Sequence, residues 1–97
     1  MLAAFSITPL GAGESVGDHV AEAVRIVRAS GLPSDTNAMF TNVEGEWDEI
    51  LAVIRACIDK VSETAPRVTV TIKLDWRPGQ PAGRLDRDME SVERRLR

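Results

Sequence analysis

Small hydroxyl side chains recur at alternate positions in two segments of the sequence. Ser6 and Thr8 alternate with apolar residues near the start, and Thr69, Thr71 and Lys73 do the same in a later segment. Hydroxyls can donate or accept hydrogen bonds and leave room for a flat molecule. The pattern therefore suits a neutral or weakly charged heteroaromatic ligand. Threonine is also common on the solvated face of a strand, and a face buried against another subunit fits the pattern at least as well.

A second group of candidates lies between these two segments. Asn37, Met39 and Thr41 continue the period-two alternation and are predicted to reach the same face. Glu44 follows them and is a candidate to contact a cationic or amino-bearing ligand. The alternative interpretation is that Glu44 and Glu46 simply flank a turn, with Glu46 favouring the start of a helix.

The sequence holds little that could form a catalytic or metal centre. Cys57 is the only cysteine and His19 the only histidine, which excludes an intramolecular disulfide and disfavours zinc sites within one chain. We expect Cys57 to be a buried thiol and His19 a surface or helix-edge residue. The glycine loop at residues 11–13 precedes Glu14 and lacks the lysine and spacing of a P-loop, so an ordinary turn is favoured. We predict no enzyme activity, no metal and no cofactor.

Composition narrows the possible partners. The net charge is −3, and the arginines of the C-terminal segment are interleaved with acidic residues. With two Phe and two Trp there is no basic and aromatic platform, so no nucleic-acid partner is predicted. The sequence shows no signal peptide and no membrane span, which makes the cytoplasm the expected location. A chain of 97 residues predicts a single domain, 1–97, whose modest core favours assembly into oligomers.

Periodicity predicts the elements that position these residues. The predicted order is a strand, an amphipathic helix, two short strands or a bent hairpin, a second amphipathic helix, a strand and a polar C-terminal helix. Their approximate ranges are 2–9, 16–30, 34–43, 47–63, 67–76 and 85–97. This order predicts an α+β fold, the ferredoxin-like βαββαβ sandwich, with two helices on one face of an antiparallel sheet plus a short C-terminal helix.

In that fold the first and last strands are neighbours within the sheet. Ser6 and Thr8 should then share an open face with Thr69, Thr71 and Lys73, uncovered by either helix. The C-terminal helix carries only a thin apolar stripe, so we expect it to pack on the body of the protein or on a partner chain.

An ordered set of short segments runs through nearly the whole chain and resembles the thiamine-binding protein family, in its small, single-domain, YkoF-like members. The segments are Phe5-Ser6-Ile7-Thr8-Pro9-Leu10-Gly11, Gly13-Glu14-Ser15-Val16, Ser30-Gly31-Leu32-Pro33, Met39, Thr41, Glu44-Gly45-Glu46-Trp47-Asp48-Glu49, Arg67-Val68, Ile72-Lys73-Leu74-Asp75 and Ser91-Val92-Glu93. The resemblance implies the same ferredoxin-like fold, a homo-oligomer (dimer or tetramer) and non-catalytic binding of thiamine or its hydroxymethylpyrimidine moiety in the cytoplasm.

The resemblance also implies a set of ligand-binding residues. They are Ser6, Thr8, Asn37, Met39, Thr41, Glu44 and Lys73. The hydroxyls and the amide would bond the pyrimidine, and Glu44 would face the thiazolium or the amino group. This chain departs from the family at Phe40, where a glycine is usual, and at Trp76, where an acidic residue is usual. The alternative hypothesis is a small oligomeric regulatory or structural module that senses another heteroaromatic effector.

Overall fold

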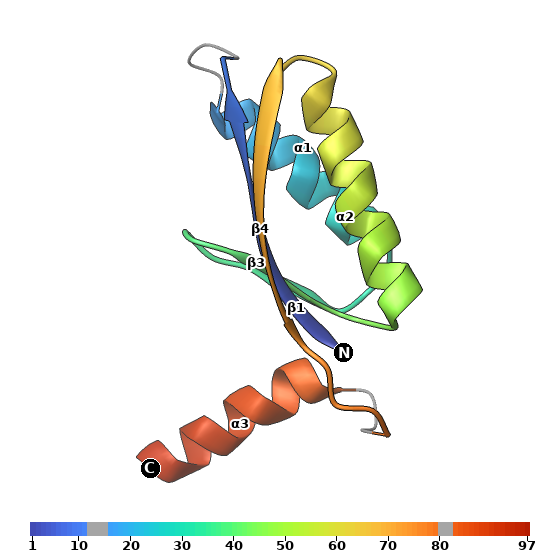
Figure 1. The fold of residues 1–97 in the computed structure, drawn as a ribbon. Coiled ribbons are helices and arrows are strands. Elements are labelled where there is room, and N and C mark those ends of the chain that lie inside the picture. The colour runs from blue at the N-terminus through green and yellow to red at the C-terminus, as the bar shows by residue number, and fades with distance from the viewer. Residues whose placement is uncertain (12–15, 80–82) are drawn as a thin grey trace.

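The computed structural model describes residues 1–11, 16–79 and 83–97. Two helices cover one face of a four-stranded antiparallel sheet, and a third helix extends from the opposite end of the molecule (Figure 1). The elements are β1 (Leu2–Leu10), α1 (Val16–Ala29), β2 (Ser34–Thr36), β3 (Thr41–Glu44), α2 (Trp47–Ser62), β4 (Arg67–Asp75) and α3 (Arg84–Leu96). The predicted ferredoxin-like α+β fold with a C-terminal helix is confirmed. Residues 12–15, with most of the predicted glycine loop, lie outside the described residues.

The sheet has the strand order β2-β3-β1-β4. β1 pairs with β4 along its whole length, and the register places Ser6 opposite Thr71 and Thr8 opposite Thr69. The predicted adjacency of these hydroxyls is thus confirmed. β3 is much shorter than β1 and pairs only with Leu2–Phe5. Beyond Phe5, that side of β1 has no strand neighbour in the described sheet.

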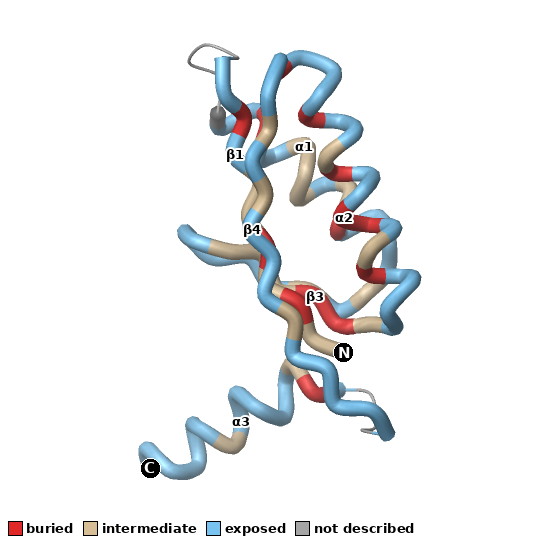
Figure 2. The backbone as a smooth tube through the Cα atoms, in the orientation of Figure 1, coloured by how far each residue is buried: buried red, intermediate tan, exposed pale blue. Residues whose placement is uncertain are grey.

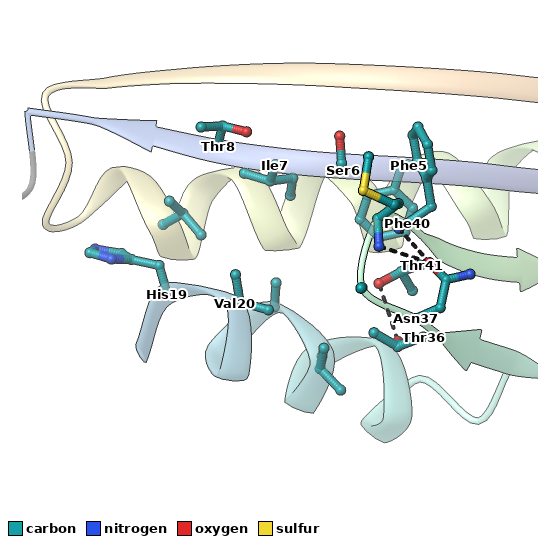
Figure 3. A pocket seen from close by; sticks show the side chains of 15 residues that line it. Phe5, Ser6, Ile7, Thr8, His19, Val20, Thr36, Asn37, Phe40 and Thr41 are labelled. Atoms are coloured by element: carbon teal, nitrogen blue, oxygen red, sulfur yellow. Dashed lines mark hydrogen bonds between the residues drawn. The ribbon is translucent and has the colours of Figure 1, made fainter. Parts of the chain in front are cut away.

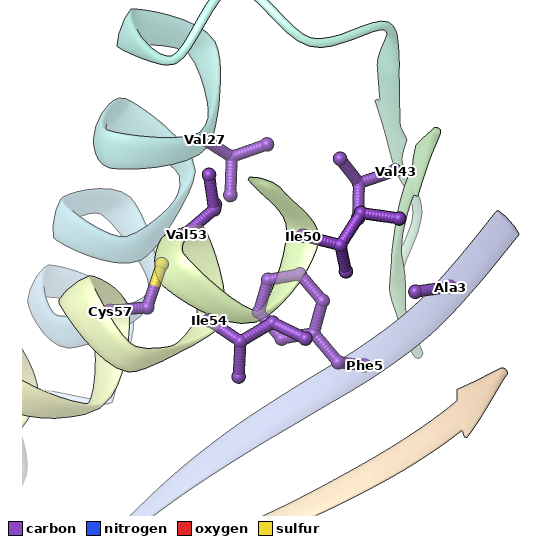
Figure 4. Close-up of a cluster of buried hydrophobic side chains, with 8 residues drawn as sticks. All are labelled: Ala3, Phe5, Val27, Val43, Ile50, Val53, Ile54 and Cys57. Atoms are coloured by element: carbon purple, nitrogen blue, oxygen red, sulfur yellow. The ribbon is translucent and has the colours of Figure 1, made fainter. Parts of the chain in front are cut away.

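The core lies between the sheet and the two helices that cover it. Its fully enclosed members come from β1, β3, α1 and α2, and they pack around the ring of Phe5 (Figure 4). They are Ala3, Phe5, Val27, Val43, Ile50, Val53, Ile54 and Cys57. Trp47, the first residue of α2, lies outside this core and is 49% exposed.

α3 departs from the compact body. Most of its residues are exposed, including Met89, Val92 and Leu96, which form the predicted apolar stripe (Figure 2). Only its first residues are enclosed by the body. The helix is therefore held at one end, and how that end is held bears directly on one of the predicted site residues.

Candidate ligand-binding site

A cavity of about 220 Å³ lies beside β1, next to Thr41, the first residue of β3. α1 forms one wall, β1 another, and the turn between β2 and β3 closes one end. We call this space the β1 cavity. It is lined by Phe5, Ser6, Ile7, Thr8, His19, Val20, Ala23, Val24, Val61 and residues 36–41. Because β3 is short, α1 and the turn border a space beside β1 that β3 does not reach.

The β1 cavity combines an apolar surface with a polar rim. Ser6 and Thr8 lie on one side of β1 and Ile7 on the other, and His19 and Val20 of α1 lie across from the strand (Figure 3). Side chains from both faces of β1 line the space, so the cavity adjoins the edge of the strand rather than one face of the sheet. The arrangement can enclose a flat ring and bond its polar atoms from the rim.

The turn that closes the β1 cavity is held by Asn37. Its Oδ1 accepts the N–H groups of Met39 at 2.8 Å and Phe40 at 3.0 Å, and its own N–H donates to the Phe40 carbonyl at 3.0 Å. Thr36 Oγ1 and Thr41 Oγ1 lie 3.2 Å apart across the same turn. The Asn37 oxygen is thus engaged within the turn, which leaves the amide N–H₂ for other contacts.

Five of the seven predicted site residues line the β1 cavity, but only two of them lie on the sheet face that was predicted. Ser6 and Thr8 lie on the open face of β1, as predicted. Thr41 pairs with Phe5 and lies on the helix side, so its predicted place on the open face was wrong. Val43 must be in the core, and alternation then carries Thr41 to the same side. Asn37 and Met39 are in the turn, where alternation no longer applies.

Lys73 lies apart from the β1 cavity. It pairs with Ala4 and borders a shallow depression of about 100 Å³ on the open face, together with Leu2, Asn42 and Leu85. The structure therefore places this side chain with the open sheet face and the start of α3.

Glu44 has a different position from the predicted one. It is 7% exposed, and its carboxylate caps α3: Oε2 accepts the Arg84 N–H at 2.8 Å and Oε1 accepts the Leu85 N–H at 3.2 Å. The first N–H groups of a helix have no partners within it, and a carboxylate satisfies them well. Glu44 is thus a structural cap, and its proposed contact with a cationic ligand does not fit this geometry.

Arg84 completes the attachment of α3. Its side chain is 5% exposed, forms an ion pair with Asp75, and donates from Nη1 to the Asp75 carbonyl at 3.3 Å. The hydrogen bond from Arg84 lowers the pKa of the Asp75 carboxyl below its usual value, with the positive charge acting in the same direction. Sequence reasoning missed Arg84, because an arginine among many in a polar segment carries no local signal of burial.

His19 and Cys57 form hydrogen bonds within the protein. His19, predicted at the surface or at a helix edge, is 9% exposed and lines the β1 cavity, and its Nε2 lies 2.5 Å from Thr64 Oγ1. Cys57 is buried, as predicted, and its Sγ donates to the Ala23 carbonyl at 3.5 Å. Burial raises the pKa of this thiol to about 11. Among the described residues, no group of three His, Cys, Asp or Glu side chains could hold a metal ion.

Comparison with known proteins decides the family. The family model for the thiamine-binding protein matches residues 3–93. The chain belongs to the thiamine-binding protein family. A member of the UPF0045 group from Mycobacterium bovis is 56% identical over 80 residues, which span 81% of this chain and 78% of that protein.

Solved structures agree with this fold. A Methanocaldococcus jannaschii protein of known structure has a TM-score of 0.84 and 33% identity, covering 95% of this chain and 94% of that one. A Thermotoga maritima protein, provisionally named for thiamine biosynthesis or salvage, has a TM-score of 0.78 at 16% identity, covering 92% and 96%. No helix in the described parts of this family member is long and apolar enough to cross a membrane.

Proposed function

We propose that this chain binds thiamine or its hydroxymethylpyrimidine moiety without catalysing a reaction, as a homo-oligomer in the cytoplasm. The observation that carries the proposal is the β1 cavity itself, around which Ser6, Thr8, Asn37, Met39 and Thr41 gather from two segments far apart in the sequence. Membership of the thiamine-binding protein family supports the choice of ligand. The proposed site is the β1 cavity rather than the open sheet face.

The size and lining of the β1 cavity favour one flat ring. Its volume of about 220 Å³ lies below the roughly 300–1,000 Å³ of drug-sized ligand sites. A pyrimidine can pack against Ile7 and Val20 while the Thr36 and Thr41 hydroxyls bond its polar atoms. Phe40 borders the same space and narrows it. The remainder of thiamine would then extend out of the cavity.

A neighbouring cleft bears on the form of the ligand. It shares His19 and Val61 with the β1 cavity and is also lined by three carboxylates and one ammonium group. These charged residues are Asp18, Glu22, Glu63 and Lys60. Glu63 pairs with Lys60 and Glu22 with Arg25, so among the described residues Asp18 is the one carboxylate of this lining in excess of these ion pairs. Its negative charge favours the thiazolium cation and disfavours phosphate groups within the screening length of the solution. We therefore propose free thiamine or the pyrimidine, rather than thiamine phosphates, as the ligand.

The proposal of a homo-oligomer is supported by the surface outside the cavity. β4 is the last strand of the sheet, so its outer edge has no strand partner among the described residues. α3, which follows β4 in the chain, exposes an apolar stripe formed by Met89, Val92 and Leu96. Light scattering should give a mass above that of one chain, and Val92→Asp should lower it more than Arg94→Asp. A monomer at micromolar concentration would contradict this part of the proposal.

Calorimetric titration tests the ligand and the site together. The matched variants are Thr41→Val, which removes a hydroxyl lining the β1 cavity, and Thr71→Val, which removes one from the open face. We expect thiamine or the pyrimidine to bind, with Thr41→Val weakening binding and Thr71→Val leaving it unchanged. If Thr71→Val weakens binding and Thr41→Val does not, the ligand binds on the open sheet face instead. Absence of both heat and thermal shift at millimolar ligand would refute the proposed function, since ligand at 100 times Kd stabilises by about 2.7 kcal/mol.

A further inference from the structure

The backbone of β1 presents hydrogen-bonding groups along its edge beyond Phe5, where its pairing with β3 stops. Met1 and Gly45 exchange two hydrogen bonds, at 2.9 and 3.1 Å. In an antiparallel pair every second residue directs its N–H and C=O to the same neighbour, so Ala3 and Phe5 also bond to β3. Ile7 is the next residue in this series. Its N–H and C=O point to the same side, where β3 no longer runs and the described residues offer no strand partner.

This edge borders the β1 cavity. The cavity is lined by Ser6 and Thr8 from one face of the strand and by Phe5 and Ile7 from the other (Figure 3). A space bordered by side chains of both faces lies against the backbone edge between them. The Ile7 N–H and C=O are therefore the main-chain groups of β1 that a molecule in the cavity would meet.

The N–H and C=O of Ile7 can bind a ligand edge of one particular kind. One donor and one acceptor side by side match a ligand edge with an acceptor beside a donor, as amide groups do across a sheet. A 4-aminopyrimidine has that edge, because its ring nitrogen accepts and its neighbouring amino group donates. Pro9, the next residue of β1 directed to this side, has no N–H. Within β1 the edge thus offers a single donor beyond Phe5, which fits one small ring better than a continuing strand.

We propose that the Ile7 N–H and C=O at the unpaired edge of β1 recognise the amino-pyrimidine edge of the ligand and select it over the 3-deaza analogue, in which a CH group replaces the ring nitrogen beside the amino group. The inference rests on the proposed function and adds the group that sets specificity. The Ser6, Thr8 and Thr41 hydroxyls can each donate or accept, so they adapt to either analogue. A backbone N–H can only donate, so the 3-deaza analogue leaves the Ile7 N–H without an acceptor, and Ile7 discriminates between the two.

Binding of both analogues by the full chain tests the inference. The wild-type chain should bind hydroxymethylpyrimidine or thiamine at least ~10-fold more tightly than the corresponding 3-deaza compound, because the 3-deaza edge leaves the Ile7 N–H without an acceptor. Ile7→Pro removes the N–H, and Ile7→Ala removes most of the same side chain but keeps the N–H. We expect Ile7→Pro to lose the discrimination and Ile7→Ala to retain it.

A second variant covers the case in which Ile7→Pro fails to fold. In a chemically ligated full-length chain, the α-hydroxy acid analogue of isoleucine at position 7 replaces the N–H by an ester oxygen and keeps the side chain. This chain should bind the pyrimidine compound ~10-fold more weakly and the 3-deaza compound nearly as before. If the wild-type chain binds both compounds equally, or the ester chain keeps the wild-type preference, the inference is wrong while the proposed function stands. If neither compound binds the wild-type chain, both are wrong.

Discussion

The attachment of α3 through Glu44 gives a prediction whose size can be worked from the structure. Replacing Glu44 by alanine removes the acceptors of the Arg84 and Leu85 N–H groups, which lie 2.8 and 3.2 Å from its oxygens. Loss of an N-cap costs about 0.5–2 kcal/mol. A buried, charge-assisted hydrogen bond contributes about 1.5–3 kcal/mol. We therefore expect Glu44→Ala to weaken the attachment of α3 by about 2 kcal/mol, or ~30-fold in its opening equilibrium.

Hydrogen exchange of the α3 amides measures this opening, because, among the described residues, the hydrogen bonds that join α3 to the body lie in its first turn, to Glu44 of β3 and Asp75 of β4. Glu44→Gln keeps one acceptor oxygen and should lose about 1 kcal/mol, roughly fivefold in protection. Glu90→Gln makes the same charge change at an exposed position of α3 and should have little effect. The samples must be compared at equal oligomeric state. If protection in α3 stays within about twofold of wild type in Glu44→Ala, the carboxylate does not hold the helix.

Three further outcomes follow from the core and from the titrating groups. Ile54→Ala should destabilise the protein by roughly 2–5 kcal/mol in urea unfolding, because it leaves a cavity in the core. Cys57, with a pKa of about 11, should resist a thiol reagent at pH 8 until the chain is unfolded; rapid native labelling would contradict its burial. The pKa of Asp75 is lowered by Arg84, so the stabilisation is present above the unfolded-state value and is lost as pH falls through the folded-state value. Trp76 fluorescence should report that acid transition, and Asp75→Asn should abolish it.

Local patterns in the sequence were sufficient to predict the elements and the faces of the long strands. The alternation of Val68, Val70 and Leu74 with Thr69 and Thr71 places the apolar residues toward the helices, and pairing with β1 follows that pattern. Strand faces can be predicted in this way because the side-chain period of two is a property of the backbone itself.

Other features depended on contacts between residues far apart in the sequence. Glu44 caps a helix that begins 40 residues later, and His19 is buried against Thr64, 45 residues away. No local pattern encodes such pairs. Both residues were therefore predicted from their neighbours in the sequence, Glu44 as a ligand contact and His19 as a surface or helix-edge residue.

The β1 cavity was decided by the tertiary structure alone. Its existence follows from the difference in length between β1 and β3, and the side of Thr41 follows from the burial of Val43. The sequence by itself determined that hydroxyls line β1 and that two short strands or a bent hairpin occupy residues 34–43. Where they meet depends on where the pairing of β1 with β3 ends at Phe5, since strand register and length are set by packing across the whole sheet.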